Sequence, residues 1–280
     1  MATHVLESSQ DTRDERRALA VAGGAHLLHD GYTDLIYLLL PIWQPEFSLS
    51  FAAVGVLRAL YTGTMAAFEV PATLLPRLGQ TNTSGPAAGA AELSADPPQK
   101  FGFALLLAIG LLDSATRMAF LTYLPFLLTH KGASVATVGI ALTLVFAGGA
   151  AGKLACAFIG ARIGVIATVF LTEGLTTALI LALLPLRLEL CLVLLPVLGL
   201  ALNGTSSVLY GSVPVLVRAE QRARAFGIFY TGVIGAGAAA PVLFGLVGDA
   251  LGVTMTLAIV ALMPLFTLVP ALVLRPSLAR

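Results

Sequence analysis

The stretch His26-Leu-Leu-His29-Asp30-Gly-Tyr-Thr33-Asp34-Leu-Ile-Tyr37 lies inside the first long apolar segment of the chain. Its polar residues fall at i, i+3, i+4, i+7, i+8 and i+11, which is one stripe of an α-helix. The surrounding segment 18–43 is long enough to cross a hydrocarbon layer of about 30 Å at about 1.5 Å per residue. Because ionisable groups in hydrocarbon cost roughly 3 kcal/mol each, the stripe has to face protein or a water-filled cavity. We interpret this helix as one wall of a cavity.

The polar stripe has two interpretations. In the first, it lines a pathway for substrate and protons, and the pathway residues are His26, His29, Asp30, Thr33, Asp34 and Tyr37. Asp30 and Asp34 are then the natural proton carriers or cation sites, and the histidines titrate near neutral pH. In the second, the same side chains pair with neighbouring helices and bind no ligand. The spacing of the first His–His–Asp group also suits a metal, but no further His or Cys at a ligand-like spacing supports one, so no metal or cofactor is predicted.

The composition agrees with a membrane protein. The chain has 280 residues, of which 58% are hydrophobic and 11% are charged, whereas soluble domains carry about 25% charged residues. The formal net charge of +1 gives no basic patch for nucleic acid. No HExxH, GxSxG or phosphate-loop motif occurs, so an enzyme is not predicted. The sequence therefore predicts an all-α polytopic membrane protein.

Eight apolar spans are expected, separated by short loops and one long polar segment. The spans cover about 18–43, 50–75, 102–128, 134–158, 164–185, 189–214, 222–247 and 252–274. An even number of spans puts both termini on one side, and Lys and Arg are concentrated there, while the opposite loops hold only Lys131 and Arg187. The positive-inside rule then predicts a multi-pass protein of the plasma (inner) membrane with both termini in the cytoplasm.

An internal repeat relates the first two spans to the third and fourth. Asp30-Gly-Tyr-Thr-Asp34 matches Asp113-Ser-Ala-Thr-Arg117 at an offset of 83, and Pro41 matches Pro125 at an offset of 84. Such repeats are typical of transporters built from two equivalent halves. The third and fourth spans continue into four more spans, whereas the first two run into the polar segment. If the architecture were two halves of six helices, the first half would lack four.

Further ionisable residues lie within the later spans. Arg58 is expected at the same depth as Asp34, so it either pairs with Asp34 or extends to the outer interface. Asp113 and Arg117 share a helix face at i and i+4, which suits intrahelical pairing as well as a substrate role. Glu173 stands among threonines and is expected to be either protonated or facing the cavity.

Two other groups of polar residues carry open interpretations. Asn203, Ser206, Ser207 and Tyr210 give the sixth span a polar face, which either lines the pathway or forms interhelical hydrogen bonds. Glu69 and Lys153 occupy equivalent positions near the cytoplasmic ends of the second and fourth spans, at an offset of 84. Their opposite charges suggest gating between the halves, although Lys153 could equally extend to the interface.

Several motifs resemble the major facilitator superfamily. His29-Asp30-Gly-Tyr-Thr-Asp34 and Leu-Pro41-Ile-Trp-Gln-Pro45-Glu46-Phe resemble the first helix of its fosmidomycin-resistance-like efflux branch. Leu202-Asn203-Gly204-Thr-Ser-Ser-Val-Leu-Tyr210 and Arg222-Ala-Arg224-Ala-Phe-Gly227 resemble helices ten and eleven of that fold. The family's loop signature is incomplete, because Arg77-Leu-Gly79 and Arg162-Ile-Gly164 lack its preceding Asp.

The resemblance implies an incomplete major facilitator fold, in which family helices three to six are missing. Residues 1–17 would be a cytoplasmic tail, 18–79 a two-helix remnant of the first half, 80–100 a flexible linker and 101–280 the six-helix second half. The implied function is secondary transport, namely proton-coupled efflux (antiport) of a small drug-like or metabolite molecule across the lipid bilayer. The resemblance also implies that Asp34 and Arg117 come together at the outer gate of the transporter. The alternative is a transport-inactive remnant that acts as a membrane interaction or dimerisation partner.

Overall fold

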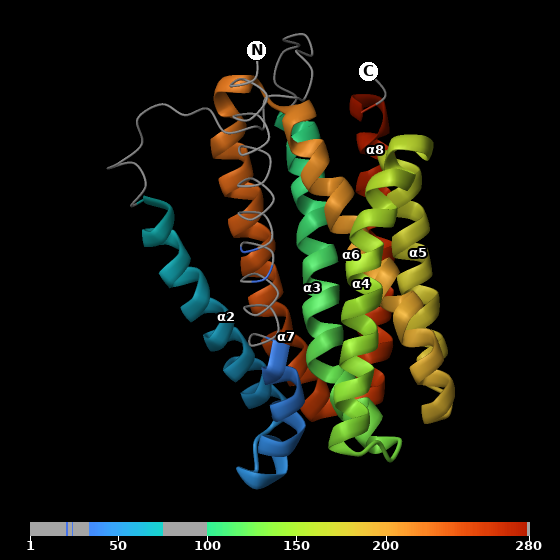
Figure 1. The fold of residues 1–280 in the computed structure, drawn as a ribbon. Coiled ribbons are helices and arrows are strands. Elements are labelled where there is room, and N and C mark those ends of the chain that lie inside the picture. The colour runs from blue at the N-terminus through green and yellow to red at the C-terminus, as the bar shows by residue number, and fades with distance from the viewer. Residues whose placement is uncertain (1–20, 22–23, 25–33, 75–99, 279–280) are drawn as a thin grey trace, which may run out of the picture.

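The computed structural model describes residues 21, 24, 34–74 and 100–278, with the backbone alone over 65–74 and at residue 100. This part of the chain is helical and contains no strand (Figure 1). A helix over 34–46 precedes α2 (Phe51–Leu74), α3 (Lys100–His130), α4 (Val135–Ile163), α5 (Val165–Leu183) and α6 (Leu188–Leu216). The elements η2 (Ala219–Gln221), α7 (Arg222–Leu262), η3 (Met263–Thr267) and α8 (Leu268–Leu278) complete it. The predicted tail 1–17 and linker residues 80–99 lie outside the described residues.

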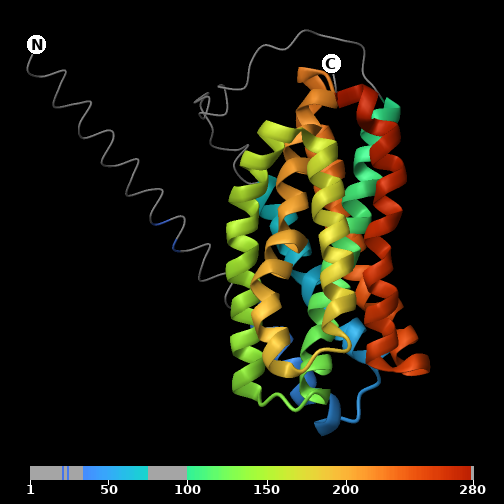
Figure 2. The same ribbon diagram turned by 90° about the vertical axis from the view of Figure 1, so that its right-hand side faces the viewer.

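Five segments of the described chain are long and apolar enough to cross a membrane, and the last of them covers Ala219–Leu278. This 60-residue segment changes direction at Gly252, whose φ of 78° lies in the left-handed region that favours glycine. Its two arms run in opposite directions, as the two perpendicular views show (Figures 1 and 2). The arms correspond to the separate spans expected at 222–247 and 252–274. The predicted all-helical membrane class is confirmed.

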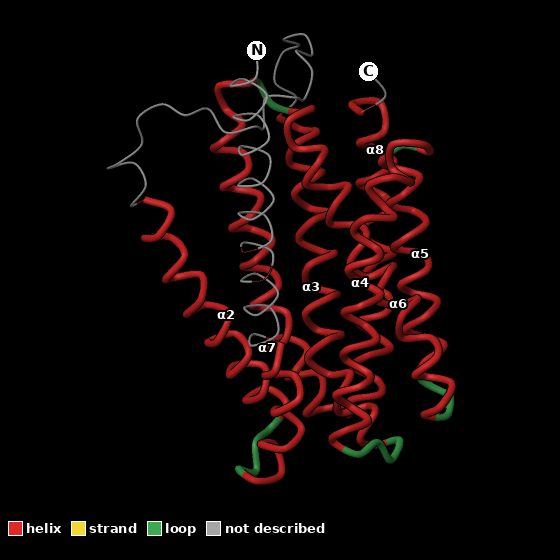
Figure 3. The backbone as a smooth tube through the Cα atoms, in the orientation of Figure 1, coloured by secondary structure: helices red, strands yellow, loops and turns green. Residues whose placement is uncertain are grey.

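The connections between helices lie at the two ends of the bundle (Figure 3). At one end, Gly164 separates α4 from α5 with a φ of 86°, which again suits glycine, and residues 217–221 join α6 to α7. At the other end lie residues 47–50, 131–134 and 184–187 and the Gly252 turn. There the Lys131 ammonium group donates to the carbonyl oxygens of Leu184 at 2.8 Å and Leu186 at 2.6 Å. This side chain therefore joins the α3–α4 loop to the α5–α6 loop.

Glycines allow α4 and α6 to pack backbone to backbone. A Cβ atom at Gly148 of α4 would lie 2.0 Å from the backbone oxygen of Pro196. A Cβ atom at Gly152 would lie 2.3 Å from the backbone oxygen of Leu200. A Cβ atom at Gly199 of α6 would lie 2.0 Å from the Val145 oxygen. Since lipid tails are as apolar as leucine, close packing of small residues is the usual way in which membrane helices associate. Large apolar side chains such as Leu154, Phe158 and Val193 are exposed on the outside, where lipid would cover them.

The start of α2 is attached to α7 and α3. The Asp249 carboxylate of α7 accepts hydrogen bonds from the backbone N–H groups of Phe51 at 2.6 Å and Ala52 at 3.1 Å. These two N–H groups belong to the first turn of α2, where no intrahelical acceptor exists, so Asp249 acts as an N-cap supplied by another helix. The Phe51 ring also packs edge-on against Phe126 of α3 at 5.4 Å. From this attachment, α2 diverges from the bundle along its length (Figure 1).

Replacement of Asp249 by alanine is expected to loosen the start of α2. Loss of an N-cap costs about 1 kcal/mol, so amide hydrogen exchange over residues 51–64 should become about fivefold faster. Hydrogen exchange followed by mass spectrometry measures this, and Glu189→Ala, in the first turn of α6 at the same end, serves as the matched control. Unchanged exchange over 51–64 in Asp249→Ala would show that the apolar contacts of Phe51 hold α2 without the cap.

Candidate functional site

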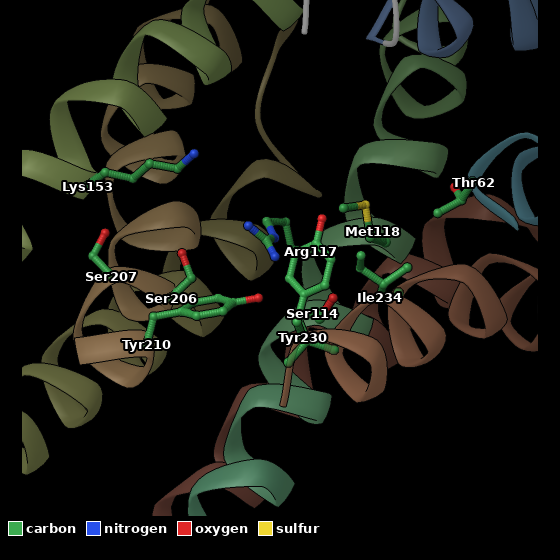
Figure 4. A pocket seen from close by; sticks show the side chains of 12 residues that line it. Thr62, Ser114, Arg117, Met118, Lys153, Ser206, Ser207, Tyr210, Tyr230 and Ile234 are labelled. Atoms are coloured by element: carbon green, nitrogen blue, oxygen red, sulfur yellow. The ribbon is translucent and has the colours of Figure 1, made fainter. Parts of the chain in front are cut away.

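A cavity of about 370 Å³ lies between α2, α3, α4, α6 and α7. Its walls combine hydroxyl groups and two cationic side chains with a larger apolar surface. The lining residues are Thr62, Ser114, Arg117, Met118, Lys153, Ser206, Ser207, Tyr210, Tyr230, Val233, Ile234 and Gly237. Figure 4 shows the Arg117 guanidinium group beside the Tyr210 and Tyr230 side chains, with the Lys153 ammonium group directed toward the same space. A polar cavity among apolar helices provides a binding place that the surrounding lipid does not.

The polar face predicted on the sixth span contributes most of one wall. Ser206, Ser207 and Tyr210 of α6 line the cavity, and the Tyr210 ring is held by an edge-on contact with Phe229 of α7 at 5.0 Å. Asn203 is the exception, because its side-chain amide donates to the Gly199 carbonyl of its own helix at 3.1 Å. The α6 face predicted from the spacing thus lines the cavity at Ser206, Ser207 and Tyr210, whereas Asn203 does not.

Arg58 is buried at one edge of the cavity. Its two terminal nitrogens donate to the Tyr37 hydroxyl at 2.7 Å and to the Thr62 hydroxyl at 2.6 Å, and the guanidinium carbon lies 4.6 Å from the centre of the Tyr37 ring. The Tyr37 hydroxyl in turn donates to the Met118 sulfur at 3.3 Å. Because Thr62 and Met118 also line the cavity, Arg58 connects the helix over 34–46, α2 and α3 directly beside it.

Substitution of Tyr37 by phenylalanine is expected to destabilise the chain. It removes an acceptor from a guanidinium group that is only 6% exposed, and an unsatisfied buried donor costs about 1–3 kcal/mol. Thermal unfolding of the detergent-solubilised protein measures the change. Tyr61→Phe is the matched control, since Tyr61 contacts Arg58 through its ring at 5.6 Å and the ring is retained. Equal melting temperatures for the two variants would argue against the hydrogen bond as the source of stability.

Two carboxyl groups from different helices meet behind Arg117. Asp113 of α3 is 4% exposed and Glu173 of α5 is 2% exposed, and their side chains share a hydrogen bond. Glu173 also forms a hydrogen bond with Thr205 of α6, whose hydroxyl donates to Thr172 at 2.7 Å. The charge of Arg117, one helical turn from Asp113, acts on both carboxyl groups. Glu173 therefore has partners on two other helices, which its position among threonines in the sequence does not reveal.

The remaining predicted residues are distributed as follows. Lys153 lines the cavity, and Asp34 lies half-buried at the start of the described helix over 34–46. His26, His29, Asp30 and Thr33 lie outside the described residues, as does the side chain of Glu69. A second cavity of about 500 Å³ is lined mainly by apolar residues of α5 and α8 together with Arg275, and it contains none of the predicted site residues.

Sequence reasoning missed Thr62, Ser114, Met118 and Tyr230 as cavity residues. A signal existed for two of them. Thr62 follows Arg58 by four residues and Ser114 precedes Arg117 by three, so each belongs to a helix face already marked by a polar residue. Tyr230 gave no such signal, because its neighbours in α7 are small or apolar.

Several apolar membrane-crossing helices around a polar cavity define a multi-pass membrane protein with an internal binding place. The family model described as Major Facilitator Superfamily matches residues 106–279, which is more than half of the 280 residues. The chain therefore belongs to the major facilitator superfamily and is a membrane transporter of that type. A search of curated proteins gave no match. A bilayer and a small-molecule substrate are the partners that such a transporter requires.

Proposed function

We propose that this transporter couples the efflux of a small drug-like or metabolite molecule to the entry of protons. The observation that carries the proposal is the polar cavity between α2, α3, α4, α6 and α7, with buried carboxyl groups next to its cation Arg117. Carboxylates within a membrane domain are energetically costly and therefore rare. Where they occur, they are usually paired or belong to a transport pathway such as a proton relay. In this proposal Asp30 and Asp34 carry protons on the first helix, and the cavity residues bind the substrate.

The finer assignments from sequence belong to the same proposal. The first-helix motif supports the fosmidomycin-resistance-like efflux branch, and the repeat supports a first half reduced to two helices beside a six-helix second half. The basic residues Arg162, Arg218 and Arg275 lie at one end of the bundle, and Lys131 and Arg187 lie at the other. By the positive-inside rule, the end with more basic residues and the two termini face the cytoplasm of a plasma (inner) membrane. No observation on the described residues favours the alternative of an inactive remnant.

Transport into inside-out membrane vesicles tests the proposal. Vesicles containing the full chain, with an acidic interior, should accumulate at least one compound from a panel of fluorescent small molecules. A protonophore should abolish the accumulation, because it removes the driving gradient. Arg117→Gln should reduce the accumulation strongly. Arg187→Gln should not, because Arg187 is an exposed residue of the loop between α5 and α6. Accumulation that is insensitive to the protonophore would refute proton coupling, and the absence of transport across the panel would refute the proposed efflux.

A further inference from the structure

We propose that Asp113 and Glu173 form a proton-binding site of the second half, in which the two carboxyl groups share one proton and Arg117 links its release to occupation of the cavity. This inference rests on the proposed transport function and adds to it a site on α3 and α5. The site is separate from the stripe on the first helix. It also differs from the cavity itself, because neither carboxyl group is among the lining residues.

The shared proton follows from the chemistry of the contact. Ionised carboxylates accept hydrogen bonds but cannot donate them, so the adjacent carboxyl groups of Asp113 and Glu173 repel each other unless one of them holds a proton. Both groups are almost completely buried, and two adjacent carboxylates cannot both be ionised at low cost. The pair therefore holds one proton and one negative charge.

The neighbours determine where that charge resides. Arg117 is one turn from Asp113 on the same helix, so the negative charge is best stabilised on Asp113 and the proton is held by Glu173. The group of three then has no net charge, which is the state that a membrane interior tolerates best. Among the described residues, the charged or titratable side chains that act on or face the pair are Arg117 of α3 and Tyr210 of α6. Lys153 of α4 and Tyr230 of α7 lie on the cavity walls beyond Arg117.

Arg117 provides the connection to the cavity. Its guanidinium group lines the cavity beside Tyr210 and Tyr230, and its charge also acts on the two carboxyl groups behind it (Figure 4). Loss of the shared proton would leave two negative charges that attract Arg117 away from the cavity. Conversely, a ligand that displaces Arg117 from the cavity toward the carboxyl groups would stabilise the ionised pair and favour release of the proton, as an exchange of substrate for proton requires. Proton binding and cavity occupation are thereby linked, and the linkage is reciprocal.

The test is infrared spectroscopy of the protonated-carboxyl band in the purified full chain, titrated between about pH 5 and about pH 9, the range in which buried carboxyls can titrate. We expect a band of this pair that disappears reversibly at high pH, and bands of Asp30 and Asp34 are distinguished from it because Glu173→Gln leaves them in place. Glu173→Gln should lack this band, whereas Glu189→Gln, an exposed carboxyl at the start of α6, should retain it. Fluorescence of Trp43, the one tryptophan, and size-exclusion chromatography establish that each variant is folded.

Arg117→Gln keeps both carboxyl groups and therefore remains informative if Glu173→Gln does not fold. Removal of the cation disfavours the ionised pair, so the midpoint of the band should move to higher pH by about one to three units. Lys153→Gln, the other cavity cation, should leave the midpoint in place. A carboxyl band that does not change with pH while the protein stays folded would make the pair a structural contact and overturn the inference. An unchanged midpoint in Arg117→Gln would overturn the link to the cavity.

The infrared result is independent of transport. If the vesicles transport nothing but the band titrates as expected, the proton site stands and the efflux proposal fails. If a proton gradient drives transport but no band titrates, the proposed function stands and this site is refuted.

Discussion

Replacing Gly199 by alanine is expected to lower the stability of the chain, whereas the same replacement at Gly211 on the same helix is not. The new Cβ atom at Gly199 would lie 2.0 Å from the backbone oxygen of Val145, and that backbone belongs to a helix that cannot yield locally. Overpacking of this kind costs about 1–3 kcal/mol or more. At Gly211 no atom lies within 4 Å of the new Cβ, so alanine there should stabilise the helix by up to about 1 kcal/mol.

Thermal unfolding in detergent measures the difference between the two alanine variants. The melting temperature of Gly199→Ala should fall by roughly 5 to 10 °C, and that of Gly211→Ala should stay constant or rise. Gly148→Ala, on the α4 side of the same contact, should behave like Gly199→Ala because its Cβ would lie 2.0 Å from the Pro196 oxygen. Similar melting temperatures at Gly199 and Gly211 would mean that α4 and α6 separate easily, contrary to the packing described above.

Reversal of a single charge at Asp34 or Arg117 is expected to reduce transport about a hundredfold, the consequence of breaking a pair worth about 3 kcal/mol. The two residues are related by the internal repeat, which predicts that they lie at matching depth. Both of their charges act on the Tyr37 hydroxyl. A contact between halves that forms in one conformation and breaks in the other suits alternating access.

The double variant Asp34→Arg with Arg117→Asp distinguishes a gate formed by Asp34 and Arg117 from a static pair within one half. Recovery of the melting temperature lost in each single variant would support a pair between the two halves, whereas transport itself is not expected to return because Arg117→Asp also takes the cation away from Asp113 and Glu173. The competing pair is Asp34 with Arg58, and the competing double variant is Asp34→Arg with Arg58→Asp. Arg58→Asp would lose the hydrogen bonds that the guanidinium group donates to Tyr37 and Thr62, so we expect no recovery there. Recovery only in that second double variant would refute the gate.

The helices were predictable because each span requires about twenty apolar residues, a signal that depends on local sequence alone. A change of direction near Gly252 was predictable for the same reason, since residues 248–251 separate the spans expected at 222–247 and 252–274. The face of α6 that carries Ser206 and Tyr210 also followed from helical spacing. In these cases the information lies within one or two helical turns of the chain.

The contacts that define the candidate site could not be predicted in this way. Asp249 caps α2 from 198 residues further along the chain, and no local pattern connects the two positions. Glu173 meets Asp113 only because α3 and α5 adopt one particular rotation beside α6. Depth placed Arg58 level with Asp34, but it did not reveal that Arg58 donates to the Tyr37 hydroxyl one turn further along the same helix. Partners on different helices depend on helix rotation, which composition and spacing do not specify.

The hydrogen bonds of Lys131 have a consequence for motion during transport. They hold the loop after α3 against the loop after α5, and these are the two helices that carry Asp113 and Glu173. We therefore expect α3 and α5 to move as one rigid body when the transporter changes conformation. The separation of the two carboxyl groups would then stay constant through the cycle. What changes from one conformation to the next would be the surroundings of Arg117, the one member of the group that borders the cavity.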